Sequence, residues 1–200
     1  TEFRAGICRA DVVLLNGTST VYEIKSAYDS TERLTRQIEA YRQLFDRINV
    51  ITADSQLGKV KAVIGDDIGL MVLTRRRTIS IIREPSSLKE KVKPSIIFDS
   101  LRKNEYEQII KERFGYVQNV PNARMYQVCR ELFCSIEPTI AHDEMVVALK
   151  KRGSGRRLHE LIGSVPNSLK AASLSCNLGV GQQAQFLKLL DAEIGTFLVI

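Results

Sequence analysis

The chain has few cysteines, no long apolar run and none of the glycine-rich loops that cradle nucleotide phosphates. Its cysteines form no CxxC pair, so neither a zinc site nor a disulfide framework is predicted. We expect them to be reduced core thiols in a cytoplasmic protein. Apolar runs such as Val12 to Leu15 stop far short of the roughly 20 residues of a membrane helix, so no transmembrane segment is predicted. The four cysteines are Cys8, Cys129, Cys134 and Cys176.

The overall composition is that of an ordinary globular protein with an excess of positive charge. Hydrophobic residues make up 44% and charged residues 26% of the 200 residues, which excludes wholesale disorder and collagen. The 29 basic and 23 acidic residues give a net charge of +6, which favours an anionic partner such as nucleic acid. His142 and His159 have no evident companions, so we assign them no chemistry, and no nucleophilic Ser or Cys has visible His and acidic partners.

The first ninety residues mix strand and helix signals. Asn16-Gly17 indicates the turn of a hairpin, and Asp29 stands where a helix N-cap belongs, with Glu32 as its capping-box partner. The resulting order β-β-α-β-α-β-β predicts an α/β fold with a mixed sheet flanked by helices. The expected strands are 10–15, 20–25, 48–52, 69–74 and 78–83, and the expected helices are 30–46 and about 57–64.

A polar, proline-bracketed stretch from Pro85 to Ser95 ends the strand pattern. We therefore predict an α/β domain over residues 1–88 and a small all-helical domain over 95–200. The helical domain is expected to bind substrate, a protein partner or a second subunit. Its amphipathic stretches are 96–101, 106–114, 122–135, 139–151, 157–162, 168–174 and 181–194.

Three charged residues on the predicted hairpin have the pattern of a metal site. Side chains alternate along a strand, so Glu23 and Lys25 share one face while Ile24 points into the core. Asp11 lies on the neighbouring strand, and two carboxylates from adjacent strands suit Mg²⁺. A two-residue loop would place Asp11 and Glu23 on opposite faces. A three-residue loop, Asn16-Gly17-Thr18, pairs Leu15 with Ser19 and brings the two carboxylates to one face.

This constellation resembles the PD-(D/E)XK, or restriction-endonuclease-like, nuclease superfamily, matched here by Asp11, Glu23 and Lys25. Gln37 and Tyr41 on the following helix are similar to the Q-x-x-x-Y motif of its RecB-like branch. The resemblance covers residues 9–52 and implies a restriction-endonuclease-like fold. Two departures stand out, since Ala10 replaces the usual proline and the family's first helix would precede Thr1.

The resemblance implies a metal-dependent nuclease that hydrolyses the phosphodiester bonds of DNA. Asp11, Glu23 and the Ile24 carbonyl would hold Mg²⁺, with Mn²⁺ as its substitute, and Lys25 would stabilise charge on the phosphate while Gln37 assists. One alternative is a catalytically inactive protein of the same fold that binds nucleic acid or a partner. Another makes the basic helical half the functional part and the α/β half its scaffold. For the Glu23 and Lys25 pair, a plain surface cross-strand contact is also open.

Several basic runs are candidates for phosphate contacts, with solvated surface as the alternative. We expect the DNA contacts to come from Arg33, Arg36, Tyr41, Arg75, Arg76, Arg77, Lys150, Lys151 and Arg152.

Overall fold

The computed structural model describes residues 3–5, 8–115, 121–153, 162–175 and 179–191. The chain divides into two compact units: Glu2–Lys150, and Lys151–Ile200 together with Thr1. This division differs from the predicted domains, 1–88 and 95–200, which stay a prediction.

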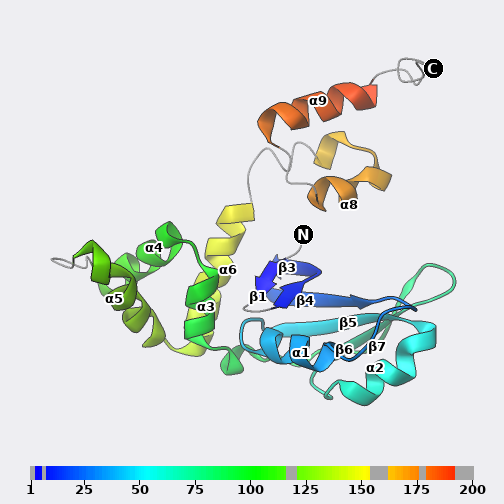
Figure 1. The fold of residues 1–200 in the computed structure, drawn as a ribbon, viewed down its shortest axis with the longest axis horizontal. Helices are drawn as coiled ribbons and strands as arrows, with labels where there is room; N and C mark the ends of the chain where they lie inside the picture. Colours follow the sequence, from blue (N-terminus) through cyan, green and yellow to red (C-terminus); the bar gives the residue numbers. More distant parts are fainter. Residues whose placement is uncertain (1–2, 6–7, 116–120, 154–161, 176–178, 192–200) are drawn as a thin grey trace. The chain divides into compact units, whose positions relative to one another are not determined.

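A mixed five-stranded sheet forms the centre of the first unit (Figure 1), in the order β3-β4-β5-β6-β7. The inner strands β4, β5 and β6 are parallel, whereas β3 and β7 run antiparallel at the two borders. This confirms the predicted α/β class and mixed sheet, but not the finer restriction-endonuclease-like form. The strands are β3 Val12–Asn16, β4 Thr18–Lys25, β5 Arg47–Ala53, β6 Gly69–Leu73 and β7 Ile79–Arg83. A separate, unpredicted hairpin joins β1 Phe3–Ala5 to β2 Cys8–Ala10.

The turn between β3 and β4 has an odd number of residues. This is the length that would place Asp11 and Glu23 on one face of the sheet. Leu15 pairs with Ser19 and Val13 with Val21, so the three-residue register is confirmed. Gly17 sits at the tip with a φ of +75°, a conformation that glycine adopts without the steric cost of a Cβ.

Two helices, α1 Leu34–Arg42 and α2 Leu57–Val63, cover one face of the sheet (Figure 1). A short 3₁₀ turn, Asp54–Gln56, leads into α2. Helix α1 is shorter than the predicted 30–46, and the predicted N-cap is wrong, because the Asp29 carboxylate accepts the backbone N–H of Ser26 at 2.7 Å and closes a turn instead. The apolar face of α1 is buried with the sheet core through Leu34, Ile38 and Tyr41.

The opposite face of the sheet carries exposed apolar side chains. Residues that alternate with the buried set along each strand belong to this face, and Leu14, Ile24, Leu73, Ile79 and Ile81 are each about half exposed on it. The prediction that Ile24 points into the core is therefore wrong.

Among the described residues after β7, the regular elements are all helical, as predicted. A 3₁₀ turn, Lys89–Lys91, precedes α3 Pro94–Ser100, α4 Lys103–Phe114, α5 Asn122–Cys134 and α6 Pro138–Gly153. Phe98 makes ring contacts with Tyr106, Tyr126 and Phe133, which pack α3, α4 and α5 together. The second unit contains α8 Asn167–Ser175 and α9 Val180–Asp191. Most of the predicted 157–162 helix lies outside the described residues.

Two expectations about composition can be compared with the fold. Cys129 is a buried free thiol as expected, whereas Cys134 is exposed, so the core assignment is wrong for that residue. Cys176 lies outside the described residues. Among the helices that the structure describes, none combines the length and hydrophobicity needed to cross a bilayer.

Candidate nucleic-acid interface

Four of the residues singled out in the sequence form one buried polar cluster between β4 and α1. Glu23 is at its centre and is only 2% exposed. Its Oε1 accepts the Lys25 ammonium at 2.9 Å and the Gln37 amide at 2.6 Å, while its Oε2 accepts the Tyr41 hydroxyl at 2.7 Å. Lys25 also donates to Gln37 Oε1 at 3.0 Å. Strand alternation and the i, i+4 spacing of Gln37 and Tyr41 explain why the pattern converges.

Asp11 lies beside the same strand, at the bend between β2 and β3. Its Oδ2 accepts the backbone N–H of Ile24 at 2.8 Å, which fixes the start of the β3-β4 hairpin against β4. The Ile24 side chain points to the opposite, open face and is 48% exposed.

The donor set of this cluster does not fit a divalent cation. A lysine ammonium and an amide N–H already occupy Glu23 Oε1, and a hydroxyl occupies Oε2, so the carboxylate is neutralised and hydrogen-bonded within the protein. Within the described residues no group of three or more His, Cys, Asp or Glu side chains is arranged to hold a metal. The Mg²⁺ or Mn²⁺ site stays a prediction.

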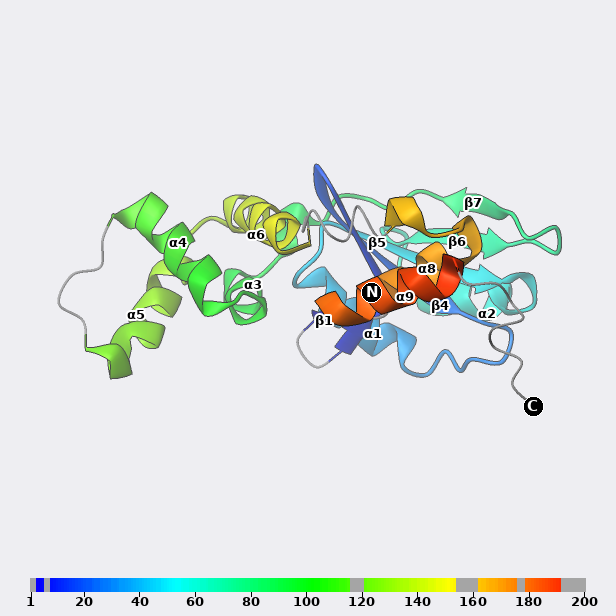
Figure 2. The same ribbon diagram turned by 90° about the horizontal axis from the view of Figure 1, so that it is seen from above.

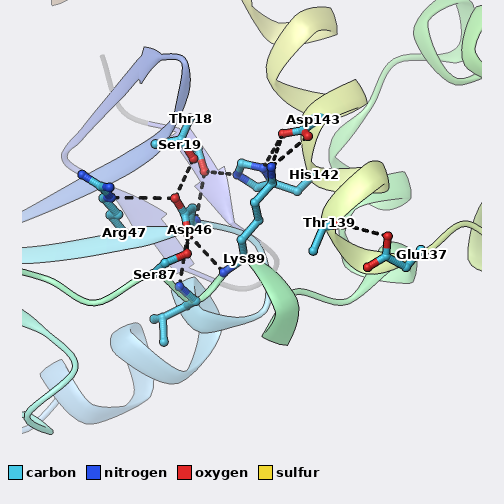
Figure 3. Close-up of polar contacts among 11 residues, drawn as sticks. Thr18, Ser19, Asp46, Arg47, Ser87, Lys89, Glu137, Thr139, His142 and Asp143 are labelled. Atoms are coloured by element: carbon cyan, nitrogen blue, oxygen red, sulfur yellow. Dashed lines mark hydrogen bonds and ion pairs between the residues drawn. The ribbon is translucent and has the colours of Figure 1, made fainter.

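A second buried network, at the other end of β4, was not predicted (Figure 3). Asp46 precedes β5 and is 4% exposed. Its carboxylate accepts the hydroxyls of Thr18 at 2.7 Å and Ser87 at 2.5 Å, together with the backbone N–H groups of Leu88 and Lys89, both at 3.1 Å. Burial acts to raise the pKa of Asp46, but the hydrogen bonds from Ser87 and Thr18 outweigh it and hold the pKa below its ordinary value.

His142 on α6 extends this network from the sheet to the helices. Its Nε2 lies 2.7 Å from Ser19 Oγ, which also accepts the backbone N–H of Asp46 at 3.1 Å. Asp143 lies 3.4 Å from His142 Nδ1 and forms an ion pair with Lys89. Burial lowers the pKa of His142 below its ordinary value, although the hydrogen bond to Asp143 and the charge of Asp46 oppose the shift.

The order Ser19, His142, Asp143 has the polarity of a catalytic triad, but its position rules that role out. Ser19 and His142 are both 0% exposed, so no substrate reaches the hydroxyl. We therefore assign the network a structural role, which joins α6 to the sheet. Nothing in the sequence could have revealed it, because Ser19 and His142 are 123 residues apart and neither belongs to a local motif.

Exposed arginines lie on two segments at the edge where the three parallel strands end. The carboxyl ends of β4, β5 and β6 lie together, since Lys25 pairs with Thr52 and Thr52 with Val72. Helix α1 begins at this edge, and the hairpin from Thr74 to Thr78 extends beyond it. We call the exposed arginines of these two segments the basic edge; they are Arg33, Arg36, Arg75, Arg76 and Arg77.

The other residues predicted to contact DNA do not belong to the basic edge. Tyr41 is fully buried in the Glu23 cluster, so the prediction that it contacts DNA is wrong. Lys150, Lys151 and Arg152 lie near the end of α6, where the two lysines are exposed. His159 lies outside the described residues.

Comparison with known proteins identifies a phage family. A family model described as bacteriophage P4 protein cII matches residues 1–172. Protein cII of Enterobacteria phage P4 is 30% identical over 63 residues, which cover 32% of this chain and 24% of that protein. The chain thus matches about a quarter of the length of this relative. No solved structure shows a significant match.

These findings overturn the nuclease prediction. The family match covers most of the chain and is to protein cII, not to a PD-(D/E)XK nuclease, so the predicted superfamily and the metal-dependent DNA hydrolysis are wrong. The pattern of a metal site has a structural explanation here, because Glu23, Lys25 and Gln37 form hydrogen bonds with one another inside the fold. The chain belongs to the bacteriophage P4 protein cII family.

Proposed function

We propose that the protein binds DNA through the basic edge, with its arginines on the phosphates. One observation carries this proposal: five exposed arginines, on two segments at the same edge of the sheet, have no ion-pair partner among the described residues. Arginine without an internal partner is available for bidentate contacts with phosphate oxygens.

Other arginines of the same unit are neutralised within the protein. Arg42 forms a short ion pair with Asp67, Arg83 with Asp66 at 2.7 Å, and Arg113 with Glu144 at 2.5 Å. The arginines of the basic edge have no such partner among the described residues, so their positive charge is open to a polyanion.

The hairpin tip presents its arginines on a short, defined turn. Thr74 and Thr78 close it through a backbone hydrogen bond of 2.8 Å and a contact of 2.8 Å between their hydroxyls. Arg77 has a φ of +59°, an uncommon conformation for a residue with a Cβ. A cleft of about 300 Å³ opens beside this turn, lined by Ala53, Asp54, Ser55, Leu73, Thr74 and Arg75. Phosphate contacts from such a tip would position DNA without reading its sequence.

Two further features accord with the proposal. Lys150, Lys151 and Arg152 supply a second set of candidate phosphate contacts on α6. The free thiols of Cys129 and Cys134 suit the reducing cytoplasm predicted from the sequence.

Titration of a fluorescent DNA duplex at several salt concentrations tests the proposal. Replacing Arg75, Arg76 and Arg77 with Glu should weaken binding and flatten the slope of log affinity against log salt by about 0.9 for each phosphate that is no longer neutralised. The matched control replaces Lys103, Lys111 and Arg124, exposed residues of α4 and α5, with Glu and so makes the same change in net charge.

The proposal predicts a loss of affinity in the hairpin variant and a much smaller loss in the control. Equal losses would show that only net charge matters. An unchanged salt slope in the hairpin variant would show that these arginines are solvated surface residues that do not contact phosphate. Tighter binding to RNA than to the DNA duplex would reassign the partner.

A further inference from the structure

The turn that follows β4 presents one aromatic ring to solvent. Tyr28 is 98% exposed, whereas the next most exposed of the large hydrophobic side chains that the structure describes reach 55%. Its side chain takes part in no hydrogen bond or ring contact with the described residues. An aromatic side chain stabilises a fold when its apolar ring leaves water, so the exposed ring of Tyr28 contributes nothing of this kind.

The backbone that carries this ring is held on both sides of Tyr28. The Asp29 carboxylate accepts the Ser26 N–H at 2.7 Å, and the Tyr28 N–H donates to Ser26 Oγ at 3.3 Å. Gln56, which is only 8% exposed, donates its amide to the carbonyl of Ala27 at 2.8 Å and to that of Asp29 at 3.4 Å. A buried side chain thus fixes the residues before and after Tyr28, and the ring projects from an ordered turn.

The turn of Tyr28 lies at the same end of the sheet as the basic edge. Figure 2 shows the segment after β4 and the hairpin between β6 and β7 at this end. Gln56 belongs to the 3₁₀ turn Asp54–Gln56, whose first two residues line the cleft beside Arg75. Neighbouring strands are about 4.8 Å apart, so the ends of β4 and β6, which are separated by β5, are about 10 Å apart. The exposed ring and the exposed arginines therefore share one edge.

We propose that the Tyr28 ring stacks on an unpaired base of the DNA whose phosphates the basic edge contacts, so that the protein prefers single-stranded to duplex DNA. This step rests on the proposed function. Aromatic rings beside positive charge bind single strands without reading their sequence, because every base has a face on which a ring can stack. In a duplex the base faces are already stacked and only their edges are open in the grooves, so a duplex must be unstacked before it offers the ring a base.

The surroundings of the ring favour a nucleic-acid strand over a protein partner. An aromatic anchor in a protein interface fits into a closely packed, desolvated cluster. Residues 26–33 contain no large apolar side chain besides Tyr28, so the ring has no such surroundings on its own segment. The same segment ends in Arg33, and Arg36 follows on α1, which places guanidinium groups for phosphate contacts after the ring.

Fluorescence anisotropy with a dye-tagged single strand of mixed sequence, and with the duplex made from it, tests the stacking. Tyr28→Ala should weaken binding of the single strand by about 5- to 150-fold, the effect of removing one stacked ring, and weaken binding of the duplex much less. The salt slope should stay the same, because no charge is removed. Tyr28→Phe keeps the ring and should bind as the wild type does.

The matched control, Phe114→Ala, removes another exposed aromatic ring, on α4, and should leave both affinities unchanged. Circular dichroism melts check that each variant is folded.

A tryptophan gives a direct signal, because the chain contains none. In the Tyr28→Trp protein, a base that stacks on the indole ring should quench its emission when the single strand is added. The duplex should quench it far less, and neither DNA should quench the emission of the Phe114→Trp protein.

The outcomes separate this inference from the proposed function. Salt-dependent binding of the single strand that Tyr28→Ala does not weaken overturns the stacking and leaves the proposed function standing. Tighter binding of the duplex than of the single strand by the wild type does the same. A wild type that binds neither DNA overturns both proposals.

Discussion

The two ends of β4 enter two buried polar networks that use the same chemistry over very different sequence distances. At the carboxyl end, Glu23 accepts hydrogen bonds from residues 2 to 18 positions away. At the amino end, the network of Asp46 joins Thr18 to Ser87 and, through Ser19, reaches His142 on α6. In both networks one buried carboxylate collects several donors and so holds a helix to the sheet. A motif of reactive side chains can therefore be an internal anchor.

The largest expected effect is on the long-range network. Asp46→Ala leaves the hydroxyls of Thr18 and Ser87 and the Lys89 N–H without their acceptor, whereas the Leu88 N–H keeps the backbone carbonyl of residue 46 at 2.8 Å. We expect the free energy of unfolding to fall by about 3–5 kcal/mol. Urea denaturation measures it. Asp66→Ala is the control, because the Asp66 side chain is fully exposed and solvent screens its ion pair with Arg83, so its loss should be far smaller. A loss no larger than that of the control would contradict the anchoring role.

The short-range network should respond by a somewhat smaller amount. Glu23→Ala leaves the Lys25 ammonium and the Gln37 amide without their acceptor, and we expect a loss of about 2–4 kcal/mol in the free energy of unfolding. Adding Lys25→Met should recover part of that loss, because it removes the buried charge that the first substitution leaves unpaired. If Glu23→Ala instead stabilises the fold, the cluster is strained in the manner of a binding site, and the two ends of β4 differ in kind.

Local residue patterns predicted much of the α/β half. The alternation of Thr20 to Lys25, the turn at Asn16-Gly17 and its register all come from interactions within a few residues, and the structure has them. The convergence of Glu23, Lys25, Gln37 and Tyr41 also followed from strand and helix periods. Asp29 shows the limit of local signals. Its carboxylate could either cap α1 or accept the Ser26 N–H and close a turn, and the structure has the turn.

What the sequence could not supply depends on tertiary context. The packing of α1 on β4 decides whether the Glu23 carboxylate is accessible to a cation or is hydrogen-bonded to its neighbours. The spacing of residues in the sequence does not predict how close this packing is. Ile24 was expected in the core because it alternates with Glu23 and Lys25 along the strand, yet the helices cover the face of Glu23 and Lys25 instead. The hydrogen bond between Ser19 and His142 depends on where α6 packs against the sheet. The residue spacing within a helix or strand does not predict that position.

Acidification should weaken the long-range network. Burial lowers the pKa of His142 in the folded state, so near pH 6 the unfolded chain binds more protons than the folded one. Stability is then fully present above the ordinary histidine pKa of about 6.5 and falls as pH drops below it, by at most about 1.4 kcal/mol per pH unit for one group. Asp46 adds a loss only at more acidic pH, since its folded-state pKa lies below the ordinary value of 3.8.

Urea denaturation between pH 7.5 and 5 measures this slope, with His142→Gln as the comparison. Glutamine keeps a polar group near Ser19 but does not titrate, so the difference between the two slopes isolates His142 from His159. The groups facing His142 are Ser19, Asp46, Lys89 and Asp143, and the pKa values of the two carboxyls are held below their ordinary value, outside that range. If the free energy of unfolding depends on pH with the same slope in both proteins, the pH dependence comes from groups other than His142.

The smallest effect, and the most specific one, is the coupling between Ser19 and His142. In a double-mutant cycle of Ser19→Ala and His142→Gln, we expect a coupling free energy of about 1 kcal/mol, the net contribution of one buried hydrogen bond. Thr20→Ala replaces Ser19→Ala in the control cycle, because Thr20 is adjacent on β4 but on the opposite face. If the Ser19 cycle shows no more coupling than the control, α6 is held to the sheet by its apolar contacts alone. The two ends of β4 would then differ in whether their polar contacts stabilise the fold.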